Sequence, residues 1–201
     1  NFIKSGRNVF IHGKSGTGKS TFIRYIRQTL SKQGKNVVLV SPTAIAALNI
    51  KGQTIHSFFR LNPENIYEKI AFKAKKELAQ RWKNIDIFIF DEISMVRSDV
   101  FDRVNSRLQE VLGTNDPFGG KQIIVVGDLY QLPPVYNTNS ELKQDLIFSE
   151  KYLTPYVFGA LCFKDLNFEH IIFTKVFRQK NLTFVKHLSA LQDKSENTLQ
   201  E

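Results

Sequence analysis

A run of eight residues, GKSGTGKS from Gly13 to Ser20, has the spacing G-x-x-x-x-G-K-[ST]. Its glycines let successive backbone N–H groups point toward one centre, and such nests bind phosphate groups. The Lys19 ammonium could reach the β- and γ-phosphates of a nucleotide, and the Ser20 hydroxyl could bind Mg2+. The alternative is a glycine-rich turn that only caps a helix. We expect these residues to contact the nucleotide: Gly13, Ser15, Gly16, Thr17, Gly18, Lys19, Ser20 and Thr21.

Two adjacent carboxylates, Asp91 and Glu92, follow the apolar run at residues 85–90. A nucleoside triphosphatase needs an acid that anchors Mg2+ and a group that prepares the attacking water. Asp91, at the end of a buried strand, fits the metal role beside Ser20, and Glu92 is the candidate general base. The alternative is a pair of acids favoured by the dipole at a helix N-terminus. The upstream loop favours the first interpretation, so ATP and Mg2+ are the expected ligands.

The elements that must position these groups can be predicted from apolar patterning. Strand-like runs occupy residues 9–11, 37–40, 85–90, 123–126 and 168–173. Because they are apolar almost throughout, we expect a mostly parallel sheet that is covered on both faces. One amphipathic helix should follow the phosphate loop and stop near Gly34, and another should run from an N-cap at Ser98 to Gly113. This alternation predicts an α/β fold of three layers.

Charge is distributed unevenly along the chain. The 201 residues include 28 Lys and Arg against 19 Asp and Glu, a net charge of +9. No acid precedes Glu64, whereas ten basic residues do. This asymmetry indicates a polyanionic partner for the N-terminal part, the alternative being a solvated basic face.

Cysteine content and hydropathy exclude several classes of protein. The single cysteine, Cys162, cannot form an internal disulfide or a cysteine zinc site, and it indicates a reducing compartment. It lies in an apolar run, so we expect a buried thiol. The longest uncharged stretch, residues 36–50, is too short to span a bilayer, so no membrane association is expected. Residues 60–83 are more polar and could form an insertion, and residues 181–192 resemble a last amphipathic helix.

Further motifs follow the phosphate loop in a fixed order. They are SPTAIAALN from Ser41, QTIHSFF from Gln53, DEISMV from Asp91, GDLYQLPPV from Gly127 and VFRQ from Val176. Together they resemble the petite-integration-frequency (PIF) helicases of superfamily one, over residues 8 to about 192. The resemblance implies that residues 1–201 are a RecA-like ATPase motor domain with a small wedge-like insertion at about 58–83. It also implies a second RecA-like domain, which these residues do not include.

The resemblance also implies roles for individual residues. Gln131 would sense the γ-phosphate, and Arg178 would contact it from the far side of the site. A single DNA strand would run past Pro42, Thr43, Asn49, Thr54, His56, Ser57, Pro134 and Val135. Several of these carry short donors suited to phosphate oxygens. Without the resemblance, a structural role for His56, a loop role for Gln131 and a surface ion pair for Arg178 would be the interpretations to prefer.

The neighbouring Phe58 and Phe59 could stack on bases or belong to the core. The segment from Arg60 to Asn65 is a candidate for the element that splits DNA strands.

The function implied is an ATP-dependent helicase that moves 5′ to 3′ on single-stranded DNA and unwinds duplexes, forks and G-quadruplexes in replication, repair, recombination and telomere maintenance. Its compartment would be intracellular: the nucleoid or cytoplasm of a bacterium, or the nucleus or mitochondrion of a eukaryote. Two alternatives are a nucleotide-switched assembly ATPase of the clamp-loader kind and a passive single-strand-binding module. Without a second motor domain and its arginine finger, we expect ATP and Mg2+ to bind but hydrolysis to be very slow.

Overall fold

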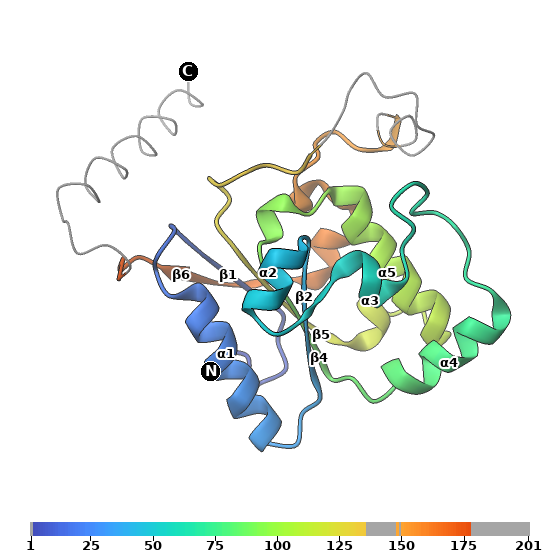
Figure 1. Cartoon of the computed structure of the whole chain (residues 1–201), viewed down its shortest axis with the longest axis horizontal. Helices are drawn as coiled ribbons and strands as arrows, with labels where there is room; N and C mark the ends of the chain where they lie inside the picture. Colours follow the sequence, from blue (N-terminus) through green and yellow to red (C-terminus); the bar gives the residue numbers. More distant parts are fainter. Residues whose placement is uncertain (1, 136–147, 149, 178–201) are drawn as a thin grey trace.

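The computed structural model describes residues 2–135, 148 and 150–177. Six parallel strands form one sheet in the order β3-β2-β4-β5-β1-β6 (Figure 1). The strands are β1 (Val9–Gly13), β2 (Val37–Ser41), β3 (Gln53–Thr54), β4 (Ile87–Phe90), β5 (Gln122–Gly127) and β6 (Glu169–Phe173). The prediction of a parallel sheet is confirmed. The short strand β3 was not predicted, because it is polar and pairs over only two residues beside β2.

Helices cover both faces of this sheet. They are α1 (Lys19–Lys32), α2 (Ala44–Asn49), α3 (Ile55–Phe59), α4 (Phe72–Trp82) and α5 (Ser98–Leu112), with short 3-10 turns η1 (Ile93–Met95), η2 (Pro117–Gly120), η3 (Val157–Gly159) and η4 (Leu161–Leu166). Helix α1 packs an aliphatic stripe on one face, and α3, α4 and α5 pack on the other (Figure 1). Side chains of β5 alternate between the two cores, which gives the expected three layers.

One helix boundary differs from the prediction. Helix α5 ends at Gly113, which adopts the expected left-handed conformation, but its N-cap is Arg97 and Ser98 is already helical. The Ser98 hydroxyl donates instead to the carbonyl of Thr154, at 2.9 Å. A serine beside an amphipathic run therefore marked the helix start to within one residue, and tertiary contact redirected its side chain.

The α3 and α4 face is lined with aromatic rings. Phe59 is fully buried, which favours the core alternative over base stacking. Phe58 lies parallel to Trp82, with ring centroids 5.7 Å apart and an interplanar angle of 14°. Trp82 is itself buried, and this stack occupies one face of the Phe58 ring, so both phenylalanines contribute to the core.

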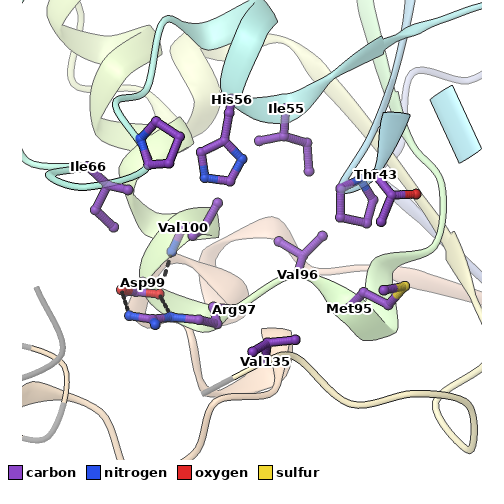
Figure 2. A pocket seen from close by; sticks show the side chains of 12 residues that line it. Thr43, Ile55, His56, Ile66, Met95, Val96, Arg97, Asp99, Val100 and Val135 are labelled. Carbon is purple, nitrogen blue, oxygen red and sulfur yellow. Dashed lines mark hydrogen bonds and ion pairs between the residues drawn. The ribbon is translucent and has the colours of Figure 1, made fainter. Parts of the chain in front are cut away.

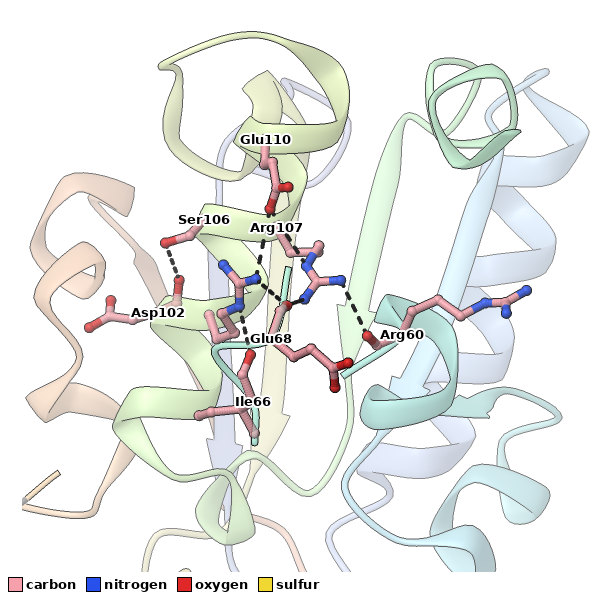
Figure 3. A network of polar contacts seen from close by, with 8 residues as sticks. Arg60, Ile66, Glu68, Asp102, Ser106, Arg107 and Glu110 are labelled. Carbon is pink, nitrogen blue, oxygen red and sulfur yellow. Dashed lines mark hydrogen bonds and ion pairs between the residues drawn. The ribbon is translucent and has the colours of Figure 1, made fainter. Parts of the chain in front are cut away.

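Residues 60–71 connect α3 to α4 and are anchored by two arginines of α5 (Figure 3). Arg103 donates to the carbonyls of Ile66 and Glu68, at 2.7 and 3.0 Å. Arg107 donates to the carbonyls of Arg60 and Glu68, at 3.2 and 2.7 Å. Burial lowers the pKa of Arg107 to about 10, with a contribution from Arg103, so it stays charged at neutral pH.

The apolar side chains of the same region pack on the main core. Leu61, Ile66, Leu78 and Trp82 are buried in the aromatic cluster. The wedge role of residues 58–83 stays a prediction, and any strand-splitting surface must come from the polar residues between these anchors.

The remaining expectations concern the C-terminal part. Cys162 is buried as predicted, and burial raises the pKa of its thiol, with a further contribution from Asp102. The helix expected at residues 181–192 lies outside the described residues. Within the described part of the chain, no helix has the length and apolarity needed to cross a membrane.

Candidate functional site

The phosphate loop joins the end of β1 to the start of α1. Gly13 must be glycine, because a Cβ there would lie 2.4 Å from the carbonyl oxygen of Phe173 on β6. Gly18, the N-cap of α1, has φ 92°, a conformation that side-chain-bearing residues rarely adopt. No side chain caps this helix, so its first N–H groups remain available to an anion.

Lys19 curls back over this loop. Its Nζ donates to the carbonyls of Gly13 and Lys14, at 2.6 and 3.0 Å. Burial lowers the pKa of Lys19, and the nearby charges of Asp128, Glu92 and Asp91 raise it. The ammonium is therefore held against the loop, within the electrostatic influence of these three carboxylates. Thr17 is buried and its hydroxyl donates to Lys14 O at 2.8 Å, so its side chain stabilises the loop.

Asp91 and Glu92 differ sharply in environment. Asp91 follows β4 and is 4% exposed, and burial raises its pKa to about 6, assisted by the Glu92 charge. Glu92 has φ 52° and ψ 47°, a left-handed conformation that costs a non-glycine residue about 1 kcal/mol. This turn places the Glu92 side chain at the edge of the nucleotide hollow, while Asp91 stays buried beneath it.

We call the space above the loop the nucleotide hollow, of about 500 Å3. It is lined by Ser15, Gly16, Gly18, Lys19, Ser20, Thr21, Arg24, Glu92, Gln131 and Phe177. The structure thus brings the loop, the candidate base and Gln131 together, as the motifs predicted. Arg24 was not predicted; it lies on α1 one turn beyond the loop, and helical spacing from Ser20 and Thr21 could have indicated it.

Asp128 is a further residue that sequence reasoning left without a role. It is 1% exposed, and its carboxylate accepts from the Gln131 side-chain amide at 3.1 Å and from the Tyr130 N–H at 3.2 Å. It follows β5 as Asp91 follows the adjacent β4. Parallel strands end at the same edge of a sheet, so the position of Asp128 directly after a strand could have indicated that it lies near Asp91.

The segment after β6 closes one side of the nucleotide hollow. The Phe177 N–H donates to Gly16 O at 2.8 Å, and the exposed Phe177 ring lies 4.0 Å from the position that a Cβ on Gly18 would take. Arg178 comes next and lies outside the described residues. Its role at the γ-phosphate stays a prediction, supported by the approach of its neighbour to the loop.

A second space, which we call the strand hollow, has a volume of about 250 Å3 (Figure 2). It is lined by Pro42, Thr43, Ile55, His56, Pro63, Ile66, Met95, Val96, Arg97, Asp99, Val100 and Val135. Four of these, Pro42, Thr43, His56 and Val135, are predicted DNA contacts from three distant segments. The other four, Asn49, Thr54, Ser57 and Pro134, do not line it: Asn49 is exposed on α2 and Pro134 is buried.

Two threonines beside the strand hollow cap short helices. Thr43 Oγ1 accepts from the Ala46 N–H and Thr54 Oγ1 accepts from the Ser57 N–H, both at 3.2 Å. Accepting through a lone pair leaves each hydroxyl proton able to donate. Such caps can therefore hold the backbone and still offer a donor to a phosphate oxygen.

A buried ion pair lies in the strand hollow. The Arg97 guanidinium donates to both carboxylate oxygens of Asp99, at 2.9 and 2.7 Å, and Asp99 is fully buried. Burial lowers the pKa of His56, while Asp99 raises it and Arg97 lowers it, so a neutral imidazole faces the hollow at pH 7. Arg97 and Asp99 were not predicted, because nothing in the motifs singled them out.

The nucleotide hollow and the strand hollow are joined by two short segments. One runs from Glu92, in the nucleotide hollow, to Arg97, in the strand hollow. The other runs from Gln131 to Val135 in the same sense. Each is six residues or fewer, and the first passes through the core at Ile93 and Val96, so only a few residues separate the two hollows along the chain.

The PIF1-like helicase model matches residues 1–195. This chain belongs to that family. The ATP-dependent DNA helicase Pif1 of Campylobacter jejuni is 36% identical over 193 residues, which cover 92% of this chain and 40% of that protein. The human PIF1 helicase is 30% identical over 197 residues, covering 94% of this chain and 28% of the relative. The chain thus spans less than half the length of these PIF1-like relatives.

Solved structures of PIF1-like helicases share the fold. Bacteroides Pif1 in complex with ADP-AlF3 and single-stranded DNA matches with a TM-score of 0.81 and 38% identity, over 96% of this chain and 44% of that one. Pif1 helicases at forked double-stranded DNA match with a TM-score of 0.83 and 38% identity, over 96% of this chain and 46% of theirs. These likenesses confirm the expected RecA-like fold class.

Proposed function

We propose that the chain is the first motor domain of an ATP-dependent DNA helicase. The observation that carries this proposal is the pair of short segments, residues 92–97 and 131–135, that link the nucleotide hollow to the strand hollow. A motor must convert the state of its nucleotide into a change of grip on its track. Glu92 and Gln131 would respond to the nucleotide, and the other ends of their segments would adjust the DNA contacts.

The nucleotide hollow suits ATP with Mg2+. The loop N–H groups and Lys19 would bind the phosphates, and Ser20, Thr21 and Arg24 lie on the same side. Among the described residues no three Asp, Glu, His or Cys side chains form a metal cluster, which fits an ion held by few protein oxygens and by substrate phosphates. Those oxygens would be Ser20 and Asp91. When bound, Mg2+ supplies positive charge to neutralise the phosphates.

The catalytic groups would act from the rim of this hollow. Glu92 would accept a proton from water, and Gln131, oriented by Asp128, would position that water and report on the γ-phosphate. Arg178 would add positive charge from the segment that Phe177 fixes to the loop. A second RecA-like domain would supply another arginine, so hydrolysis by this chain alone should be very slow.

A single DNA strand would pass over the strand hollow. Pro42, Thr43, His56 and Val135 would contact it there, with Ser57, Thr54, Asn49 and Pro134 beside the track. We propose 5′-to-3′ movement on single strands and action on forks and G-quadruplexes in the DNA-containing compartments of the cell. The assembly-ATPase alternative leaves the strand hollow without a role, and a passive binding module leaves the nucleotide hollow without one.

The decisive test is whether nucleotide changes the affinity for DNA. Single-stranded DNA would be titrated by fluorescence anisotropy without nucleotide, with ADP, and with a non-hydrolysable ATP analogue, each with Mg2+. We expect saturable nucleotide binding and a several-fold difference in DNA affinity between states. Equal DNA affinity in every state would contradict the proposed coupling, and unwinding by these 201 residues alone would contradict the need for a second domain.

A further inference from the structure

A third hollow, of about 390 Å3, lies between α3 and α4. We call it the α3–α4 hollow; it is lined by Gln53, His56, Ser57, Phe58, Arg60, Leu61, Leu78, Arg81 and Trp82. Its size falls within the roughly 300–1,000 Å3 typical of ligand sites. It contains no acidic residue, and it shares His56 with the strand hollow, so the two spaces adjoin.

Two arginines of this hollow are available to a ligand. Arg60 and Arg81 are both exposed, and neither guanidinium makes a hydrogen bond or ion pair with any residue that the structure describes. This contrasts with Arg103 and Arg107 nearby, whose guanidinium groups hold backbone carbonyls. Two neighbouring unpaired arginines without an acid favour an anionic ligand.

The backbone of Arg60 fixes where its side chain starts. Arg60 ends α3 with φ 53° and ψ 47°, a left-handed conformation usually occupied by glycine or asparagine. Its carbonyl accepts from Arg107 at 3.2 Å, while its side chain extends away from that network (Figure 3). The backbone conformation and the carbonyl contact together direct the Arg60 side chain away from α5.

The hollow has an aromatic floor and a polar rim. Trp82 is 1% exposed and is covered by the parallel ring of Phe58. The Trp82 ring therefore offers no open face on which a base could stack. The rim offers the amide of Gln53, the hydroxyl of Ser57 and the two guanidinium groups, which are donors suited to phosphate oxygens.

We propose that the α3–α4 hollow binds backbone phosphates of single-stranded DNA, with Arg60 and Arg81 as the charged donors. The hollow would extend the track beyond His56 and Ser57 toward α4. This inference rests on the proposed DNA-binding function and adds two charged phosphate contacts, Arg60 and Arg81, that lie outside the family motifs. Recognition there is independent of base sequence, because phosphates are the same at every nucleotide.

The test uses the salt dependence of binding to oligo-dT. Each phosphate contact to a single strand contributes about 0.7 to the slope of log K against log salt. The variants are Arg60→Gly, which also suits the left-handed backbone, Arg81→Gln, which keeps the helix, and the double variant. We expect each single change to lower the slope by about 0.7, and the double change by about 1.4. Affinity at low salt should fall several-fold for each arginine.

Matched controls separate this subsite from general charge and from folding. Lys76→Ala removes an exposed cation from α4 outside the hollow and should leave the slope unchanged. Arg60→Lys with Arg81→Lys should keep the slope, because the charges remain. All variants should bind the ATP analogue and melt like the unaltered protein.

The outcomes are distinct. If the unaltered protein does not bind single-stranded DNA, the proposed function fails and this subsite fails with it. If the unaltered protein binds and the double variant keeps the full salt slope, the subsite is overturned while the proposed function stands. A slope that changes only with duplex DNA would overturn the assignment to a single strand.

Discussion

The nucleotide hollow and the strand hollow are built in different ways. The first takes most of its lining from one contiguous stretch, the phosphate loop and the start of α1, and its chemistry comes from backbone N–H groups and charge. The second gathers side chains from segments scattered between Pro42 and Val135, and its lining is largely apolar around one buried ion pair. A contiguous site can be identified from a motif, whereas a scattered one depends on the completed fold.

The strongest test that nucleotide and DNA bind at separate sites is the substitution Lys19→Ala. Loss of the ammonium should weaken binding of the ATP analogue about 10²- to 10³-fold, the cost of removing one preorganised charged donor. Affinity for single-stranded DNA without nucleotide should change less than about twofold, because Lys19 does not line the strand hollow. Calorimetry and anisotropy would measure the two affinities, with Lys32→Ala as control. Equal losses of both would show that the sites are not separate.

The buried aromatic cluster beside α3 should contribute to the stability of the fold rather than to DNA binding. Phe59→Ala should lower the free energy of unfolding by about 3–5 kcal/mol, since it leaves a cavity in the buried cluster. Phe59→Leu should cost much less, about 1–2 kcal/mol, and leave DNA affinity unchanged. Urea unfolding and DNA titration would check both variants. If the Phe59→Leu protein is stable but binds DNA poorly, that result would support a direct contact between Phe59 and bases.

Replacing a buried carboxylate with an amide should change the free energy of unfolding in opposite directions at the two sites. Asp91 has a folded-state pKa of about 6 against an ordinary 3.8, so the folded protein holds a proton that the unfolded chain releases between about pH 4 and 6. Above pH 6 its ionisation therefore destabilises the fold. Asp91→Asn should raise the free energy of unfolding by up to about 3 kcal/mol at pH 7.5, and the gain should shrink toward pH 4. Binding of Mg2+ with nucleotide should be lost.

Asp99 provides the contrast, because Arg97 already compensates its charge. Asp99→Asn should destabilise the protein by about 3 kcal/mol, as breaking a buried pair does. Denaturant titrations at pH 7.5 and 4.5 would compare the two variants. A loss of stability in both would mean that Asp91 is also compensated.

The smallest effect should come from the cap at Thr43. Thr43→Val removes the hydrogen bond from the Ala46 N–H and should lower the free energy of unfolding by about 1 kcal/mol. It should also weaken DNA binding several-fold. Thr43→Ser keeps the acceptor and the donor and should preserve both properties. Thermal melting and DNA titration would distinguish the variants. If the Thr43→Val protein binds DNA normally, the Thr43 hydroxyl only caps α2 and does not contact DNA.

The strands of the sheet and the phosphate loop could be predicted from the sequence, because short local patterns specify both. Apolar runs identified five of the six strands, and the sixth, β3, exists only through its pairing with Val40 and Ser41 of β2. The loop was predictable because its spacing encodes a backbone shape. Phe59 was harder to place, since its burial depends on how α3 packs against Trp82, 23 residues later.

Other parts of the site depend on tertiary proximity. Asp128 and Phe177 reach the phosphate loop because β5 and β6 flank β1, an order that no local pattern specifies. Arg97 and Asp99 enter the strand hollow through the turn that Glu92 begins. The motifs identify residues that are close along the chain, whereas contacts between distant segments depend on the completed fold.

The contacts that hold residues 60–68 have an evolutionary consequence. Arg103 and Arg107 grip this segment by its carbonyl oxygens, a group that every amino acid supplies. Substitutions at the polar positions other than Arg60, the proposed phosphate donor, leave the anchor intact, so those positions are free to diversify while two arginines of α5 carry the constraint. A segment of equal length transplanted from a relative should therefore dock in the same place.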